Sequence, residues 1–324
     1  MKGQSATCFL LADVGGTHVR LAQSTDSASE LLHVRKYSCS DYSSLEEIVR
    51  DYLQSHPLAG DVSACFAVAA PVSEDSVVDQ VEMTNRDWRF SVSQLKEEFG
   101  WQSLEVINDF EAIARAVPCL QRSQLVQLGG GNVDPQGRIV VLGPGTGLGV
   151  KHLLPTLRGF KVLSGEGGHV DFAPVDEQDL IIWRYIHKHQ SRVSMEDVLS
   201  GRGLVNIYKA LAEAQDKDEA FDDAASIVRA AQNSACDVCS ESLLQLCRIL
   251  GSFAGNLALT LNTTGGVYLC GGVLTELRDL LQQSDFRMRF ESKGRFESYV
   301  KDIPAFLITA NEPGLRGALA YLQS

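Results

Sequence analysis

Short apolar runs that end in glycine-rich turns divide this chain into predicted β-strands. The clearest run lies in residues 9–22, where an apolar segment ends at Asp13, turns through three small residues and becomes apolar again. The turn residues are Gly15, Gly16 and Thr17. A strand, a glycine turn and a second strand are typical of a β-hairpin.

A second copy of this pattern covers residues 139–150, with Gly145, Thr146 and Gly147 in the turn. It follows the first copy by about 130 residues. Two such hairpins predict two similar lobes that face a shared cleft.

The remaining apolar periodicity mixes strand and helix segments, which favours an α/β protein. The predicted strands lie near 7–13, 18–23, 33–38, 63–70, 104–107, 150–154, 158–163, 267–270 and 303–309. The predicted helices lie near 43–53, 91–99, 176–190, 204–215, 235–261 and 311–322.

The first glycine turn is a candidate phosphate site. Glycine tolerates positive φ and lets backbone N–H groups approach a ligand, and consecutive N–H groups can form an anion site. Thr17 adds a hydroxyl donor, and Asp13 could orient a metal-bound water or a phosphate-bound cation. A hairpin rather than a helix follows the turn, so it is neither a G-x-G-x-x-G motif nor a Walker loop. On its own, the segment also fits a plain turn.

Asn108 and Asp109 form a second polar constellation, placed between the predicted strand at 104–107 and a helix start. Either residue could be only a helix N-cap. The carboxyl end of a strand is also where α/β proteins bind ligands, so the pair is a candidate ligand site.

Residues 164–172 place three glycines around Glu166 and His169. Glycines beside charged residues let the backbone fold tightly around a small polar ligand, and these two side chains could bind adjacent hydroxyls. A solvated loop with a hydrogen-bonded pair is the alternative. Glu196, further along, has the position of an ordinary acidic residue at a helix start.

Composition and charge narrow the possible partners. A chain of 324 residues is long enough for two domains, and its net charge of −12 argues against nucleic acid or an anionic membrane. No stretch of 18 or more apolar residues occurs, so no membrane span is expected. No signal-peptide layout precedes the first predicted strand, which predicts a cytoplasmic protein.

The cysteines do not point to a structural zinc site. Cys236 and Cys239 have C-x-x-C spacing, but with Cys247 they fall on one helical stripe, and no histidine follows His189. Helix packing therefore explains them better than metal binding.

These motifs resemble those of the actin-like ATPase superfamily and, within it, the bacterial-type glucokinases. Residues 165–172 and 108–110 carry the most specific similarity, which extends from Asp13 through the final helix. The resemblance implies a two-lobed, ribonuclease H-like α/β fold with the active site in the interlobe cleft. It also implies a small domain of residues 1–119 plus 310–324 and a large domain of residues 120–309.

The resemblance also assigns roles to the candidate residues. Asp109 matches the catalytic base, and the sugar ligands fall on Asn108, Asp109, Glu166, His169 and Glu196. The positions matching ATP and phosphate contacts are Asp13, Gly15, Gly16, Thr17, Gly145, Thr146, Gly147, Gly271 and Gly272. Asp13 would help to hold Mg²⁺ through water. Related kinases of the repressor/kinase family carry a cysteine-rich zinc motif that this sequence lacks.

The implied activity is ATP-dependent phosphorylation of D-glucose at its 6-hydroxyl, feeding glycolysis, by a homodimer. A kinase for fructose, mannose or an amino-hexose would keep the catalytic roles and change only the pocket. An actin-like nucleotide switch would lack sugar chemistry, against which the Asn108–Asp109 and Glu166–His169 pairs argue.

Two residues depart from the family pattern. Pro144, in the second phosphate loop, stands where small residues are common and removes one N–H donor. His18 stands where asparagine is frequent.

Overall fold

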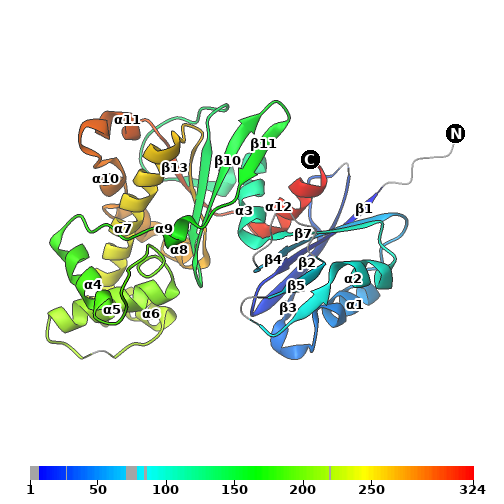
Figure 1. Cartoon of the computed structure of the whole chain (residues 1–324), viewed down its shortest axis with the longest axis horizontal. Coiled ribbons are helices and arrows are strands. Elements are labelled where there is room, and N and C mark those ends of the chain that lie inside the picture. Colours follow the sequence, from blue (N-terminus) through cyan, green and yellow to red (C-terminus); the bar gives the residue numbers. More distant parts are fainter. Residues whose placement is uncertain (1–6, 27, 71–78, 84–85, 219) are drawn as a thin grey trace. The chain divides into compact units, whose positions relative to one another are not determined.

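The computed structural model describes residues 7–26, 28–70, 79–83, 86–218 and 220–324. The described chain divides into two compact units, and Figure 1 draws the strands and helices of each. Unit 1 comprises residues 1–120 and 310–324, and unit 2 comprises residues 121–309. The domain boundaries expected from the sequence lie within one residue of these divisions.

Unit 1 is built on a five-stranded sheet with the order β3-β2-β1-β4-β7. Its first three strands form an antiparallel meander, and β4 and β7 then run parallel to β1. The strands are β1 (Cys8–Val14), β2 (His18–Thr25), β3 (Leu32–Ser38), β4 (Val62–Val68) and β7 (Ser103–Asn108). A small hairpin, β5 (Gln80–Glu82) and β6 (Arg89–Ser91), lies outside this sheet.

Helices cover both faces of this sheet. Helices α1 (Leu45–Ser55) and α2 (Val92–Phe99) pack on one face, in a core that includes Leu10 and Phe66. Helices α3 (Asp109–Ala116) and α12 (Pro313–Leu322) pack on the other face, in a core that includes Leu11. The strands alternate between these two cores because successive side chains point to opposite faces. The 3-10 turns η1 (Cys39–Asp41) and η2 (Val117–Cys119) complete the unit.

Unit 2 repeats the same strand arrangement. Its sheet has the order β11-β10-β9-β12-β13-β8, so five of its strands reproduce the two antiparallel and two parallel pairings of unit 1. The strands are β8 (Leu125–Gln127), β9 (Ile139–Pro144), β10 (Leu148–Thr156), β11 (Gly159–Leu163), β12 (Gly266–Leu269) and β13 (Ala305–Ile308). Both predicted hairpins, β1–β2 and β9–β10, are confirmed.

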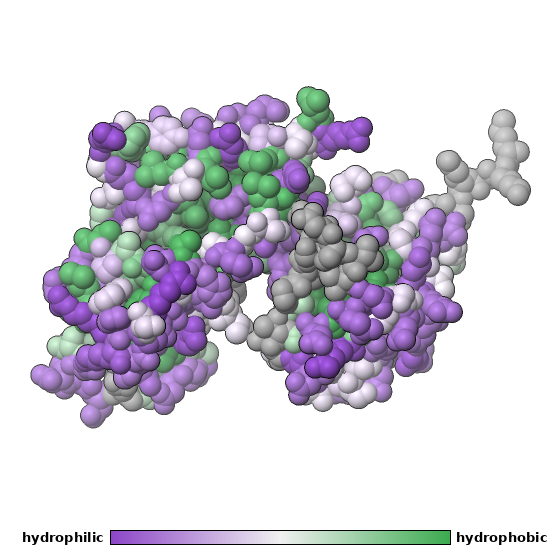
Figure 2. Space-filling view, viewed as in Figure 1, coloured by the Kyte–Doolittle hydropathy of each residue, from purple (hydrophilic) through white to green (hydrophobic). Residues whose placement is uncertain are grey.

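The helices of unit 2 pack mainly around α7 (Asp237–Leu261), its 25-residue core helix. The others are α4 (Glu177–His187), α5 (Gly201–Ala214), α6 (Ala224–Gln232), α8 (Gly272–Glu276), α9 (Arg278–Gln283), α10 (Phe286–Glu291) and α11 (Glu297–Lys301), with 3-10 turns η3 (Arg122–Gln124), η4 (Gly167–His169) and η5 (Gly294–Phe296). By length and composition, α7 is the one described helix that could cross a membrane, but 67% of its apolar window is buried, as in a core helix. In Figure 2, the visible face of unit 1 carries mostly hydrophilic side chains, and that of unit 2 carries hydrophobic groups among hydrophilic ones.

Two details of the sequence interpretation are wrong. Cys236 is not part of the helical stripe, because it is the N-cap of α7, where its Sγ accepts the N–H of Cys239 at 3.3 Å. Glu196 does not start a helix, because it lies in a turn, and α5 begins only at Gly201 with Ser200 as its cap.

Candidate active site

The first glycine turn joins β1 to β2 and is closed by backbone hydrogen bonds. The amide of Gly15 donates to the carbonyl of His18 at 3.0 Å, and the amide of Cys39 donates to the carbonyl of Thr17 at 2.9 Å. Gly15 is not in the left-handed region, so the turn does not use the conformational freedom of glycine there; a Cβ at this position would lie 3.3 Å from the His18 carbonyl oxygen. Close approach of the backbone, rather than an unusual φ, explains the glycine.

Asp13 lies at the end of β1 in a crowded electrostatic environment. Its Oδ2 is 3.5 Å from a terminal nitrogen of Arg20, the residue opposite it on β2. Burial raises the pKa of Asp13 to about 6; Arg20 opposes the rise, and the negative charges of Asp109 and Glu312 add to it. A carboxylate in these surroundings gains from an additional cation.

Asn108 and Asp109 lie where β7 ends and α3 begins. The Asn108 Oδ1 accepts the amides of Phe110 and Glu111, both at 3.1 Å, so Asn108 is the N-cap of α3. Its Nδ2 donates to the Ala70 carbonyl at 3.2 Å and to Asp109 Oδ1 at 3.1 Å. The cap therefore also orients the neighbouring carboxylate.

The second glycine turn, between β9 and β10, is braced by a distant side chain. The amide of Leu148 donates to Glu196 Oε2 at 2.9 Å, and a Cβ added to Gly147 would lie 2.6 Å from that oxygen. The carbonyl of Gly145 accepts the amide of Gly201, the first residue of α5. Glu196 thus lies directly against the turn that the sequence assigned to phosphate.

The glycine-rich loop at residues 165–169 packs against the same turn. The Glu196 amide donates to the Gly168 carbonyl at 2.9 Å, and a Cβ on Gly168 would lie 2.1 Å from the Leu148 carbonyl oxygen. His169 is exposed, with its Nε2 3.9 Å from Glu196 Oε2, and Glu166 is exposed at the start of η4. The structure therefore joins the predicted sugar loop, Glu196 and the second turn in one assembly.

The glycine pair before α8 also approaches this turn. Gly271 has φ of 126°, and a Cβ there would lie 2.4 Å from the Pro144 carbonyl oxygen, so only glycine fits. Gly272 opens α8 with free space around it. A narrow crevice follows, lined by Pro144, Gly145, Ser200, Gly201, Leu204, Ala224, Leu246 and Val273.

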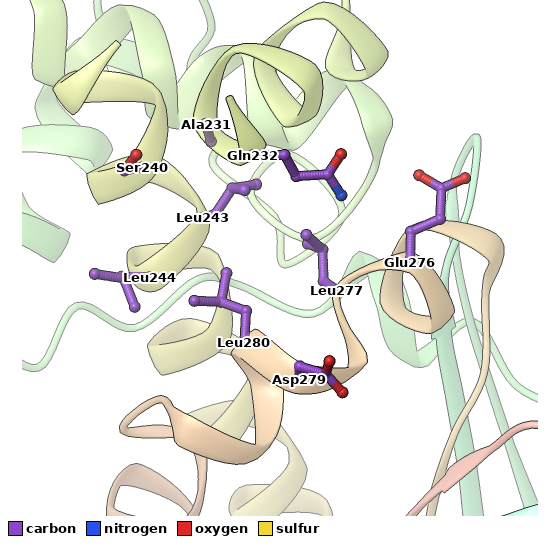
Figure 3. A pocket seen from close by; sticks show the side chains of 9 residues that line it. All are labelled: Ala231, Gln232, Ser240, Leu243, Leu244, Glu276, Leu277, Asp279 and Leu280. Atoms are coloured by element: carbon purple, nitrogen blue, oxygen red, sulfur yellow. The ribbon is translucent and has the colours of Figure 1, made fainter. Parts of the chain in front are cut away.

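One helical turn further along α8 lies a larger cavity of about 300 Å³. Figure 3 shows its leucines between α7 and the α8–α9 segment, with Gln232 and Glu276 nearby. Its lining residues are Ala231, Gln232, Ser240, Leu243, Leu244, Glu276, Leu277, Asp279 and Leu280. None of the residues predicted to bind ligand lines this cavity.

Three neighbours of the site were not predicted from the sequence. Arg20 could have been found, because the hairpin register places it opposite Asp13. The other two neighbours are Glu312, whose Oε2 lies 2.9 Å from the Arg20 Nε, and the Leu148 amide. No local sequence pattern indicates either of them, because their partners are distant in the chain.

Two units with the same strand order, each with a glycine turn in its first hairpin, fit the actin-like ATPase fold that the resemblance implies. Comparison with known proteins is more specific. The Glucokinase family model matches residues 10–324. A glucokinase from Cronobacter sakazakii is 45% identical over 314 residues, covering 97% of this chain and 96% of that protein. The chain belongs to the glucokinase family.

Solved structures agree with this assignment. A glucokinase from an Antarctic psychrotroph superposes with a TM-score of 0.87 at 38% identity, covering 97% of this chain and 98% of that one. Glucokinase from Balamuthia mandrillaris in complex with glucose gives a TM-score of 0.80 at 26% identity, covering 100% and 96%. The predicted family and fold are confirmed.

Proposed function

We infer that this protein is a glucokinase, which transfers the γ-phosphoryl group of ATP to the 6-hydroxyl of D-glucose. The observation that carries the inference is the full-length family match, residues 10–324. The strand-end carboxylate of unit 1 and the carboxylate–imidazole pair beside the glycine turn of unit 2 support it. Phosphoryl transfer requires sugar and nucleotide to be held in place, and each unit supplies groups suited to that task.

Asp109 is our proposed general base. As the first residue of α3, it accepts the amide of Phe110 at 2.8 Å and the Nδ2 of Asn108 at 3.1 Å, which fix its orientation. It would take the proton of the 6-hydroxyl as that oxygen attacks the γ-phosphorus. Asn108 uses its amide for capping and orientation, so its direct sugar contact stays a prediction.

Glu166, His169 and Glu196 are the proposed sugar ligands of unit 2. A carboxylate accepts from a hydroxyl, and an imidazole can donate or accept, so the set suits a polyol. A sugar lacking a matching hydroxyl would leave these groups unpaired, which gives selectivity.

The nucleotide contacts are assigned to the glycine turns. The phosphates would be bound by Gly15, Gly16 and Thr17 in unit 1 and by Gly145, Thr146 and Gly147 in unit 2. The crevice behind Gly145, next to Gly271 and Gly272, is the proposed adenosine side. Pro144 supplies no amide there, so the N–H donors must come from residues after it.

Asp13 fits the role of a Mg²⁺-holding residue. Its raised pKa reflects a partly buried carboxylate near other negative charges, a place where a cation is favourable. Among the described residues, no group of three His, Cys, Asp or Glu could hold a metal by itself. Mg²⁺ bound with ATP takes most of its ligands from phosphates and water, so a single carboxylate suffices. When bound, the ion neutralises charge on the phosphates.

We also propose that the protein is a cytoplasmic homodimer that feeds glycolysis. Its net charge of −12 fits a protein without nucleic-acid or anionic-membrane partners, and the dimer is expected from the family resemblance. Light scattering of the purified protein would measure the oligomeric state.

The first test is steady-state phosphorylation of a sugar panel with Mg²⁺-ATP. We expect glucose to give the highest kcat/KM among glucose, mannose, fructose, glucosamine and N-acetylglucosamine. Preference for another hexose would contradict the substrate assignment but retain Asp109 as base. ATP hydrolysis without sugar turnover would favour the nucleotide-switch alternative, which the family match does not favour.

A further inference from the structure

Glu312 adopts a backbone conformation that its residue type does not favour. It has φ of 53° and ψ of 53°, the left-handed region, and Pro313 follows it. An L-residue with a long side chain is strained there, and the residue before a proline is restricted further. Glu312 is the N-cap residue of α12, but its side chain makes no capping hydrogen bond. Helix capping therefore does not account for a glutamate at this position.

The Glu312 side chain instead holds an arginine beside the predicted phosphate site. Its Oε2 lies 2.9 Å from the Arg20 Nε, and a terminal nitrogen of Arg20 lies 3.5 Å from Asp13 Oδ2. The three side chains remain 23–31% exposed. Partly exposed ion pairs contribute only modestly to stability, so stability alone does not account for a glutamate in this backbone conformation.

The first turn of α12 also packs close to the Asp13 carboxyl group. A Cβ added to Gly314 would lie 2.9 Å from Asp13 Cγ. Glu312 and Gly314 therefore approach Asp13 from the same helix start, one through Arg20 and one by close packing. Both lie just after residue 310, where the chain re-enters unit 1.

We propose that Glu312 is a positioning residue for Asp13, acting through Arg20. By engaging the Nε edge of the guanidinium, it excludes the side-on pair in which Nε and a terminal nitrogen would both bind Asp13. A bidentate arginine would neutralise that carboxylate and compete with a cation. Held at one edge, Arg20 leaves Asp13 available to Mg²⁺-nucleotide. The role of Asp13 in this inference rests on the proposed function.

The test replaces Glu312 with asparagine, which tolerates the left-handed region but is too short to reach Arg20. We expect the unfolding temperature of the ligand-free Glu312→Asn protein to rise, because strain is relieved. We expect the Mg²⁺ concentration for half-maximal rate to rise about tenfold, as for other groups that orient metal ligands. The KM for glucose should not change. If Glu312 had only a structural role, its replacement would not stabilise the protein and at the same time weaken its use of Mg²⁺.

Two further variants complete the design. Glu312→Gln keeps the length and an oxygen acceptor for the Arg20 Nε, so it should recover most of the wild-type Mg²⁺ dependence. Ser234→Asn is the matched control, because Ser234 has φ of 53°, is exposed and lies in unit 2. It should raise stability and leave the kinetics unchanged.

The outcomes separate this inference from the proposed function. Wild-type protein without glucose kinase activity would contradict the function, and calorimetry of Mg²⁺-ADP binding would then test Glu312 alone. Wild-type activity together with an unchanged Mg²⁺ requirement in Glu312→Asn would overturn the positioning role. A lowered unfolding temperature in that variant would also overturn it.

Discussion

The two glycine turns have the same place in two similar sheets, yet different contacts hold them. The turn of unit 1 is closed by its own backbone and its neighbour, through the Gly15 and Cys39 amides. The turn of unit 2 is braced by the carboxylate of Glu196, 48 residues beyond the Leu148 amide that it accepts. The proposed catalytic and metal-holding residues of unit 1 therefore lie at separate strand ends, whereas Glu196 links the proposed sugar loop of unit 2 to its proposed phosphate turn. A single mutation in unit 1 should therefore affect one proposed function, whereas a mutation of Glu196 in unit 2 should affect both glucose and ATP kinetics.

The largest expected effect is loss of the proposed base. In Asp109→Asn, kcat should fall by about 10³-fold, because general-base catalysis contributes on the order of 10²–10⁴-fold. Both KM values should stay near wild type, since asparagine keeps the size and an oxygen acceptor for the Phe110 amide. Glu105→Gln is the control, because Glu105 is exposed on β7, the strand that ends just before Asp109. Near-normal turnover of Asp109→Asn would exclude Asp109 as the base.

Next in size is the coupling expected at Glu196. In Glu196→Ala, the Leu148 amide loses its acceptor and the turn loses its brace. We expect kcat/KM to fall about 100-fold for both glucose and ATP, or roughly 2.8 kcal/mol each at about 1.4 kcal/mol per factor of ten. His169→Ala should raise only the KM for glucose, because His169 does not contact the turn amide. Equal effects of the two variants on ATP would refute the bracing role.

A smaller effect separates capping from orientation at Asn108. Serine is as good an N-cap as asparagine, so Asn108→Ser should change the free energy of unfolding by less than about 0.5 kcal/mol. It loses the Nδ2 that donates to Asp109, so kcat should fall roughly tenfold through misplacement of the carboxylate. Chemical denaturation and initial rates measure the two quantities. Unchanged kcat would show that Asn108 serves only as a cap.

The sequence was sufficient for features that depend on local pattern. Both hairpins, the strand that ends at Asn108 and the helix that begins at Asp109 follow from apolar runs, turn residues and caps. The family resemblance then placed roles on these residues. Local signals succeed here because each element and its end are specified within a few residues.

Contacts between distant residues could not be predicted in the same way. Glu196 reads as a helix-start acid, but Ser194 and Asp197 form their own turn, in which both the amide and hydroxyl of Ser194 donate to Asp197 Oδ2. That turn delays the helix to Gly201 and leaves Glu196 free to reach Leu148. Glu312 similarly meets Arg20 only because the chain returns to unit 1. Such pairings depend on tertiary packing, which no local pattern encodes.

The smallest expected effect is a difference in hydrogen exchange on binding glucose. The Phe110 and Glu111 amides are already bonded to the Asn108 cap, so glucose should barely change their exchange. The loop at residues 165–169 carries exposed Glu166 and His169, so closure around a sugar should slow its exchange several-fold, as in other weakly protected segments. L-glucose, the mirror-image sugar, is the control and should leave both segments unchanged. If residues 108–112 gain as much protection as the loop, unit 1 is not preformed. Unit 1 and unit 2 would then not differ in the way proposed above.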